Sequence, residues 1–404
     1  MITRIVASDY LCLRSVGQEL SPFQILVGPN GSGKSAFLDV LAFLGTLVSD
    51  GVEAAVNERT RNLYDLVWGR EHSRFNLAVE AWLPEHYEDL QAFSFESVVR
   101  RLEEARLRGH EEDRPGQRIR YEVTIWLDPG TDFPVIEQEH LFHFAVGADP
   151  RSGFAIINRQ GATLEFRAAA DQEFRRVAYG GVHSALGSFE QPAAAWLRQH
   201  LSRGIQFVKL SVDELRRPSP PQRGAIRQFR GSDLARAVNQ LKENSPNSFD
   251  AWLAHLRTAL PDLDSVRTVL RGEDRSRYVM ARYTNGVEVP SWTLSEGTLR
   301  LLALTLLAYI PDFQGVYLIE EPENGVHPTA IETIYQSLSS IYEGQVLVAT
   351  HSPVWLALAK PEELLCFTKT AQGTEIVRGS EHPALQQWRG EVNLSDLFAA
   401  GVLG

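Results

Sequence analysis

Gly28-Pro-Asn-Gly-Ser-Gly-Lys-Ser35 is the stretch of this sequence that decides the fold. It matches the phosphate-binding loop pattern G-x-x-x-x-G-K-[ST] and follows Phe23–Val27, an apolar run that predicts a buried strand. Residues 36–44, which come next, carry apolar side chains at helical spacing. Strand, loop and helix therefore occur in the order of a phosphate site at a helix N-terminus. The stretch predicts a site for a nucleoside triphosphate.

Each part of the loop has an expected role. Glycines leave room for backbone N–H groups to converge on phosphates, because a side chain there would block the approach. Lys34 is expected to reach the β- and γ-phosphates and to act in catalysis, and Ser35 to ligate magnesium. ATP and Mg²⁺ are the expected cofactors. The predicted nucleotide-binding residues of the loop are Asn30, Gly31, Ser32, Gly33, Lys34 and Ser35.

Composition restricts the class of protein. The 404 residues are 44% hydrophobic and 23% charged, which is typical of a globular chain with room for two or three domains. The longest apolar run, 301–310, is half the length that a membrane span needs, and no secretory signal is visible at the N-terminus. We expect a cytoplasmic protein without a membrane partner. The net charge of −11 argues against a uniformly nucleic-acid-binding surface.

Two further apolar runs predict strands that end in chemically active side chains. Val316–Ile319 is followed by Glu320 and Glu321, and Gln345–Thr350 is followed by His351. Ligands of open α/β sheets bind at the carboxyl ends of the strands, so these side chains can face the nucleotide held by the loop.

These three side chains have expected roles in catalysis. Glu320 is predicted to hold hydrated magnesium, and Glu321 to polarise the attacking water. His351 can contact the γ-phosphate. Alternatively, the acids form a solvated turn and His351 is a turn or core histidine.

A third motif, Leu294-Ser-Glu-Gly-Thr298, precedes the apolar helical pattern of 299–310. Its hydroxyl and free N–H groups at a helix start suit an anion. Because the phosphate loop already surrounds one face of the triphosphate, a second subunit can supply Ser295 and Gly297 to the other face.

Together these motifs resemble those of ABC-type ATPases: a Walker-A loop at 28–35, a signature at 294–297, a Walker-B strand at 318–322 and a switch histidine at 351. The run Glu-Glu-Pro-Glu-Asn-Gly-Val-His-Pro at 320–328 resembles the stand-alone prokaryotic branch related to RecF and to the ATPase part of OLD proteins. The resemblance implies an α/β fold, a P-loop ABC-ATPase sandwich with an antiparallel β subdomain and a helical insertion. It also implies an ATP-dependent homodimer or higher oligomer, in which Ser295 and Gly297 touch the γ-phosphate held by the partner's loop.

The sequence departs from transporter ATPases in several ways. The signature follows the loop by about 260 residues instead of roughly a hundred, so a transporter role is not expected. The glutamine that would complete the magnesium shell is not identified; Gln138 is a candidate, or else an ordinary strand residue. The charged segment 96–108 predicts a short solvated helix, far too short for the arms of SMC proteins.

The middle of the chain divides by pattern. Alternating runs from 75 to about 166 predict antiparallel strands, and the pattern from 191 to about 270 is helical. The predicted domains are an N-terminal ATPase lobe (1–74), a β subdomain (75–190), a helical lid (191–285), a C-terminal ATPase lobe (286–375) and a tail (376–404).

One stretch, 209–230, is basic, with six Lys or Arg against two acids. Such a cluster can neutralise nucleic-acid phosphates, or its members can pair with acids elsewhere in the protein. The candidates for contacts to DNA or RNA are Arg216, Arg217, Arg223, Arg227 and Arg230.

Three functions remain open. The first is an ATPase of a bacterial anti-phage system that switches a nucleic-acid- or effector-bound complex, working beside a separately encoded effector such as a nuclease. The second is a RecF-like repair or recombination ATPase. The third is a scaffold in which ATP is only structural.

Overall fold

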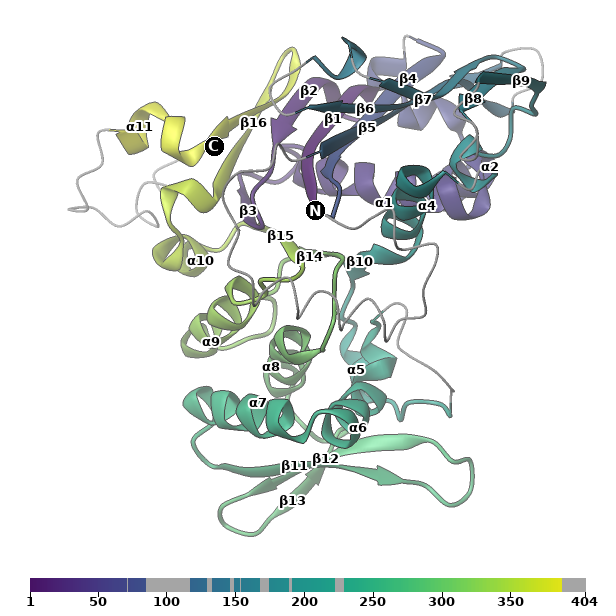
Figure 1. Cartoon of the computed structure of the whole chain (residues 1–404). Coiled ribbons are helices and arrows are strands. Elements are labelled where there is room, and N and C mark those ends of the chain that lie inside the picture. Colours follow the sequence, from purple (N-terminus) through teal and green to yellow (C-terminus); the bar gives the residue numbers. More distant parts are fainter. Residues whose placement is uncertain are drawn as a thin grey trace, which may run out of the picture. The chain divides into compact units, whose positions relative to one another are not determined.

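A computed structural model describes residues 1–70, 72–84, 117–128, 133–145, 149–152, 154–167, 174–188, 191–221 and 229–386. The chain divides into two compact units (Figure 1). The first contains residues 1–20, 36–205 and 370–374, and the second contains 21–35, 206–369 and 375–404. The phosphate loop therefore belongs to the second unit.

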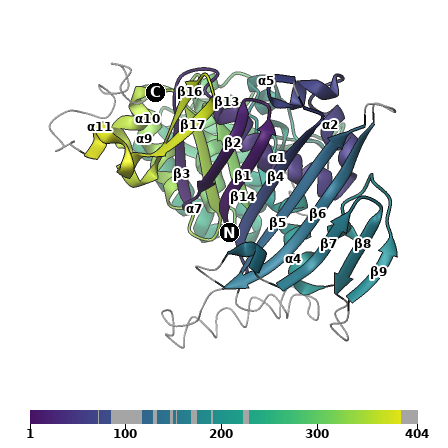
Figure 2. The ribbon, with the colours of Figure 1, turned by 90° about the horizontal axis from the view of Figure 1, so that it is seen from above.

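The first unit is built on an antiparallel sheet of eight strands in the order β2-β1-β4-β5-β6-β7-β8-β9. Figure 2 shows these strands side by side from β2 to β9. Alternation of apolar and polar residues in β5, as in Tyr121-Glu-Val-Thr-Ile, places Tyr121, Val123 and Ile125 on one face of the strand, where all three are buried. The strands are β1 (Ile2–Tyr10), β2 (Leu13–Glu19), β4 (Arg74–Trp82), β5 (Gln117–Leu127), β6 (Pro134–Ala145), β7 (Phe154–Gln160), β8 (Thr163–Arg167) and β9 (Phe174–Ala178).

Helix α1 (Lys34–Asp50), which follows the phosphate loop, contributes an apolar face to the first unit. Tyr10 is fully buried and its ring centroid lies 5.7 Å from that of Phe43 on α1 and 5.0 Å from that of Phe75. The hydroxyl of Tyr10 donates to Asp39 on the same helix. The other α-helices that the structure describes in this unit are α2 (Val52–Asn57) and α4 (Pro192–Gln199).

The second unit contains a six-stranded sheet in the order β10-β14-β15-β3-β16-β17. The pairs β14–β15, β15–β3 and β3–β16 are parallel. Both faces of these central strands are covered, which explains why they are continuous apolar runs. The strands are β3 (Phe23–Val27), β10 (Ile205–Val208), β14 (Val316–Glu320), β15 (Gln345–Thr350), β16 (Leu364–Thr370) and β17 (Gly373–Arg378).

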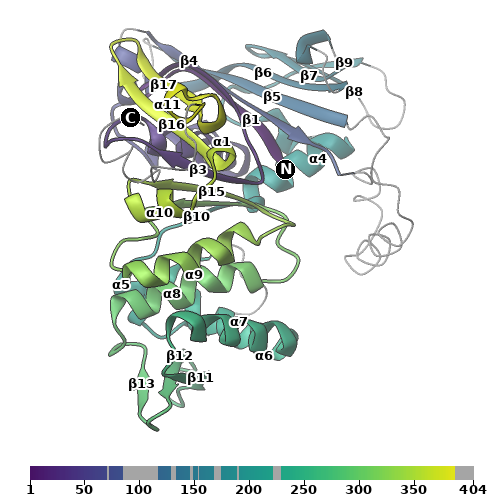
Figure 3. The ribbon, with the colours of Figure 1, turned by 90° about the vertical axis from the view of Figure 1, so that its left-hand side faces the viewer.

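Helices follow the parallel sheet in layers. Figure 3 shows α8 and α9 beneath it, then α6 and α7, and then a small antiparallel sheet of β11, β12 and β13. The strands of this small sheet are β11 (Leu263–Leu270), β12 (Arg277–Tyr283) and β13 (Glu288–Pro290). The helices are α5 (Val212–Arg216), α6 (Leu234–Asn244), α7 (Pro246–Ala259), α8 (Glu296–Leu306), α9 (Pro328–Ser339), α10 (Pro353–Leu358) and α11 (Pro383–Gln386).

The architecture differs from the predicted domain boundaries in two places. Strands β1 and β2 pair into the sheet of β4, so residues 1–19 join the β subdomain instead of a lobe spanning 1–74. The region 191–285 is helical only in part, because β10, β11 and β12 lie within it. Leu263–Leu270 is rich in β-branched residues and finds its partner strand only after the turn at 271–276, a pairing that a local pattern does not reveal.

Several predicted features lie outside the described residues: the charged helix of 96–108, Arg223, Arg227 and the tail beyond 386. Among the helices that the structure does describe, none has both the length and the apolar content that crossing a bilayer requires.

Gly45 on α1 gives a test of this packing. A Cβ at position 45 would lie 2.8 Å from the carbonyl oxygen of Leu201. Replacing a helical glycine by alanine normally stabilises a helix, but here we expect Gly45→Ala to lower the free energy of unfolding by about 1–3 kcal/mol. Urea denaturation measures the change. Gly187→Ala, where a Cβ meets no atom within 4 Å, is the control and should be near neutral. A stabilised Gly45→Ala variant would contradict this packing.

Candidate functional site

The site lies where three parallel strands of the second unit end. Val27, the last residue of β3, is paired with Thr350, the last residue of β15. Glu320, the last residue of β14, is paired with Ala349. The phosphate loop, His351 and the acids after β14 therefore leave the sheet at the same edge, as the sequence predicted.

The phosphate loop follows β3, and its first residue, Gly28, has no room for a side chain. A Cβ at Gly28 would collide with the carbonyl oxygen of Phe367. The ammonium of Lys34 donates to the carbonyl oxygens of Gly28 at 2.7 Å and of Pro29 at 3.0 Å. Ser35 is exposed in the first turn of α1. The loop thus holds Lys34 at the start of a helix, where the dipole favours an anion.

Lys34 shares its surroundings with three carboxylates. Burial lowers the pKa of Lys34 from its usual value, while the charges of Glu321, Glu320 and Glu323 act in the opposite direction. The three acids therefore act electrostatically on the ammonium group. The structure thereby brings together Lys34, Glu320 and Glu321 from stretches almost 290 residues apart.

Glu321 has an unusual backbone for a residue that is not glycine, with φ of 47°. Its N–H donates to the carbonyl oxygen of Ala349 at 2.8 Å, which fixes this turn against β15. One carboxylate oxygen accepts from Asn324 at 2.5 Å, and the other lies 3.3 Å from Nδ1 of His351. The side chains of Glu321 and His351 are 44% and 45% exposed, so this pair is accessible to a ligand and to water.

Glu320 was predicted to hold magnesium. Its Oε1 is buried and has no hydrogen-bond partner in the part of the chain that the structure describes. A buried carboxylate oxygen of this kind suits a cation, and a magnesium beside nucleotide phosphates needs only one or two protein ligands. The described residues contain no group of three or more His, Cys, Asp or Glu that could hold a metal unaided. Glu320 and Ser35 therefore fit a magnesium that is shared with phosphates.

Glu323 was not among the predicted site residues. Its Oε1 accepts from the hydroxyl of Thr350 at 2.6 Å, and its Oε2 is buried without a partner among the described residues. Burial raises the pKa of Glu323 above its usual value, against the effect of its bonds to Thr350 and His351. The signal was available: Glu323 is the third acid of the Glu-Glu-Pro-Glu run, and Thr350 immediately precedes the switch histidine.

The signature motif packs on the turn that follows the acids. Ser295 caps α8, where its hydroxyl oxygen accepts from the N–H of Thr298 at 3.1 Å. A Cβ at Gly297 would lie 2.8 Å from the carbonyl oxygen of Gly325. Ser295 and Gly297 thus have their closest described neighbours in their own helix and in the 321–327 turn, and Ser295 is exposed. Ser295 is therefore an exposed cap at the start of α8.

The predicted nucleic-acid residues occupy different surroundings. Arg216 and Arg217, at the end of α5, line a cavity in the second unit. The backbone N–H of Arg230 donates to Asp233, and Phe229 beside it is buried in the core. Gln138, the candidate for the magnesium shell, lies within β6 opposite Thr124 and Gln160, where it has the surroundings of an ordinary strand residue.

The raised pKa of Glu323 predicts a pH-dependent stability. A carboxyl whose folded pKa exceeds its unfolded value stabilises the fold while protonated, and that contribution is lost as pH rises through the folded pKa. Glu323→Gln stays neutral and keeps an acceptor for Thr350. We therefore expect it to be more stable than the parent at pH 7, with a difference that shrinks as pH falls toward 4.5, the ordinary Glu value. Thermal unfolding across this range measures the effect, and a constant difference would contradict it.

Comparisons with known proteins support the fold and the motifs. Residues 180–357 match the family described as "AAA domain, putative AbiEii toxin, Type IV TA system". A solved Smc head bound to the C-winged helix domain of ScpA is similar in structure, with a TM-score of 0.51 and 16% identity over 93% of this chain and 96% of that one. An Smc head with a coiled coil and joint from Pyrococcus yayanosii gives a TM-score of 0.51 and 11% identity over 99% of each chain. No curated protein matches the sequence.

At these identities the similarity to Smc heads concerns the fold. It agrees with the antiparallel sheet and the parallel sheet described above. The matched AAA domain contains the signature, the acids and His351. The chain therefore has the P-loop fold of Smc heads, and residues 180–357 are similar to an AAA domain.

Proposed function

We propose that the chain binds ATP with magnesium at the edge formed by β3, β14 and β15 and hydrolyses it. The observation that carries the proposal is the convergence of Lys34 with Glu320, Glu321 and His351 in one unit. The similarity of residues 180–357 to an AAA domain supports nucleotide binding, and the geometry supports a hydrolytic role for these residues.

The position of each residue suggests its role in hydrolysis. Lys34 supplies a positive charge at the helix start and would exchange its bonds to Gly28 and Pro29 for bonds to phosphate. Glu321 is half exposed, and its contact with His351 holds one oxygen at the mouth of the site. It can therefore orient a water and accept its proton, while His351 donates to the γ-phosphate. Magnesium, held between Ser35 and Glu320, would neutralise the phosphate charge.

We also propose that ATP joins two copies of the chain. The cap of α8 presents Ser295 and the N–H groups of a helix start on the surface, and these groups suit a phosphate held by another subunit. Because Gly297 packs against Gly325, the signature turn is tied to the segment that carries Glu321. A phosphate bound in trans would thereby be sensed by the hydrolytic acids.

Removal of the proposed general base tests hydrolysis. We expect Glu321→Gln to lower kcat by about 10²–10⁴-fold, because the amide cannot accept a proton, while ATP binding persists. Phosphate release and a fluorescent ATP analogue measure the two properties. Glu343→Gln, an exposed acid before β15, is the matched control and should hydrolyse ATP normally. Unchanged turnover in Glu321→Gln would refute the assignment, and an inert wild type would favour the structural-ATP scaffold.

A negative charge introduced at Ser295 tests whether ATP joins two copies of the chain. In the Glu321→Gln background, magnesium-ATP should double the mass from 45.2 kDa. Adding Ser295→Asp should prevent the doubling, because aspartate retains the helix cap but repels the γ-phosphate. Ser295→Asn also retains the cap without the charge, so its loss should be smaller. Light scattering measures the masses. A Ser295→Asp variant that doubles as readily as the parent would remove the support for a trans contact.

The matched family carries a toxin and toxin–antitoxin description, which supports a bacterial defence context with a separately encoded effector. The alternative, a RecF-like repair ATPase, is supported by the SMC-like fold. Neighbouring genes discriminate between the two contexts: an adjacent nuclease gene favours defence, and a replication operon favours repair.

A further inference from the structure

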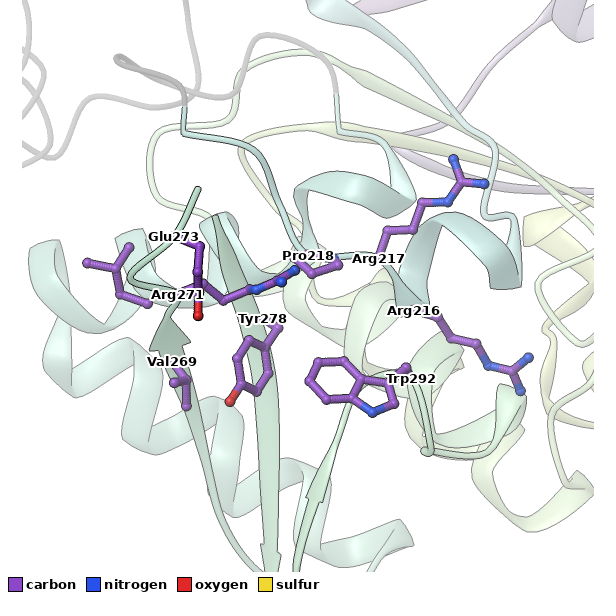
Figure 4. A pocket seen from close by; sticks show the side chains of 9 residues that line it. Arg216, Arg217, Pro218, Val269, Arg271, Glu273, Tyr278 and Trp292 are labelled. Carbon is purple, nitrogen blue, oxygen red and sulfur yellow. The ribbon is translucent and has the colours of Figure 1, made fainter. Parts of the chain in front are cut away.

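A cavity of about 690 Å³ opens in the second unit away from the residues of the phosphate site. Its walls come from the end of α5, from strands β11 and β12, and from the segment that precedes the signature helix. Figure 4 shows the rings of Tyr278 and Trp292 next to each other, with Arg271 on one side and Arg216 and Arg217 extending beyond Trp292. The motifs of the ATPase do not account for this arrangement.

The aromatic part of the cavity offers a surface for stacking. Trp292 is 49% exposed, and its ring centroid lies 4.8 Å from that of Tyr278 at an interplanar angle of 51°. Leu270, also in the wall, is 38% exposed. A large ring left this open buries apolar surface when a flat group covers it, and aromatic bases do so irrespective of their sequence.

The charged part of the cavity suits an anion. Three arginines line it against one acidic residue, Glu273. Arg271 forms a long ion pair with Asp274, 3.6 Å between Nη1 and Oδ2, and both side chains are exposed. Within the described part of the chain no carboxylate forms an ion pair with Arg216 or Arg217, and Nε of Arg216 is buried without a hydrogen-bond partner. A chain of net charge −11 therefore concentrates positive charge beside an open aromatic pair.

We propose that this cavity binds a nucleotide unit, with the base stacked on Trp292 and Tyr278 and the phosphate held by the arginines. The volume is in the range of small-ligand pockets. The unit could be a free nucleotide or an unpaired nucleotide of a single strand, which share this chemistry. Duplex ends are disfavoured because their bases are already stacked. An acidic peptide would use the arginines but leave the ring faces uncovered.

The cavity is connected to the signature. The hydroxyl of Ser291 donates to the carbonyl oxygen of Arg216 at 3.1 Å, so α5 is bonded to the segment that carries Trp292. Trp292 stands three residues before Ser295, the cap of α8. An occupant of the cavity would therefore alter the signature turn. This coupling to ATP turnover rests on the proposed function, whereas the binding itself does not.

The experiment measures binding without ATP, in the full chain carrying Lys34→Ala so that the phosphate loop does not contribute. Fluorescein-labelled oligothymidylate of about 20 nucleotides, the same sequence as a duplex, and labelled dTMP are titrated by anisotropy. We expect Trp292→Ala to weaken single-strand binding about tenfold. Arg271→Ala should weaken it and lower the salt dependence by about one phosphate contact. Tyr278→Phe should bind normally, since stacking survives.

Arg267→Ala is the matched control, because Arg267 lies on β11 but not in the cavity wall and pairs with Glu288. The proposal is supported if Trp292→Ala weakens binding and Arg267→Ala does not. Such an effect on oligothymidylate identifies a single strand as the source of the nucleotide, and such an effect on dTMP identifies a free nucleotide. Equal affinity for the duplex, displacement by polyglutamate without any effect of Trp292→Ala, or no binding of any probe would overturn it. A chain that binds oligothymidylate but never hydrolyses ATP would reject the proposed function alone.

Discussion

The in-register ending of three parallel strands is the constraint on which the site depends. Because β15 pairs with both β3 and β14, the residues after Val27, Glu320 and Thr350 must emerge together. Buried parallel strands tolerate no one-residue slip without turning apolar side chains outward. The hydrophobic core thereby fixes the positions of the loop lysine, the acids and the histidine, and the turn at Glu321 accepts a left-handed backbone to complete the arrangement.

Within the second unit, the acidic turn after β14 contacts the signature helix α8, and the segment before α8 is bonded to α5. The turn after the acids meets the signature helix at Gly297 and Gly325, where neither position has space for a Cβ. The segment before that helix carries Trp292 and is bonded to α5 through Ser291. Nucleotide chemistry, the proposed trans contact and the proposed nucleotide cavity thus lie along one continuous stretch of structure.

Much of the fold could be predicted from the pattern of apolar and polar residues. The boundaries of β3 and β15 follow from apolar runs bounded by loop residues, and the strands around Phe75 and Tyr121 from alternation. The small sheet of β11 and β12 could not be predicted from the local pattern, because its stability comes from cross-strand pairing and from packing on α6. The membership of β1 and β2 was missed for the same reason. Glu323 was missed because its burial and its bond to Thr350 arise only in three dimensions.

The sequence by itself determined the motifs from which the chemistry is predicted: a phosphate loop, an acidic strand end, a histidine and a signature, in an order that resembles ABC-type ATPases. Such motifs are local, since each needs only a few adjacent residues to set its backbone and charge. The tertiary structure alone decided which groups share an environment. Burial and strand register bring Glu323 to the hydroxyl of Thr350 and place Trp292 against Tyr278, and no local pattern encodes contacts between residues so far apart.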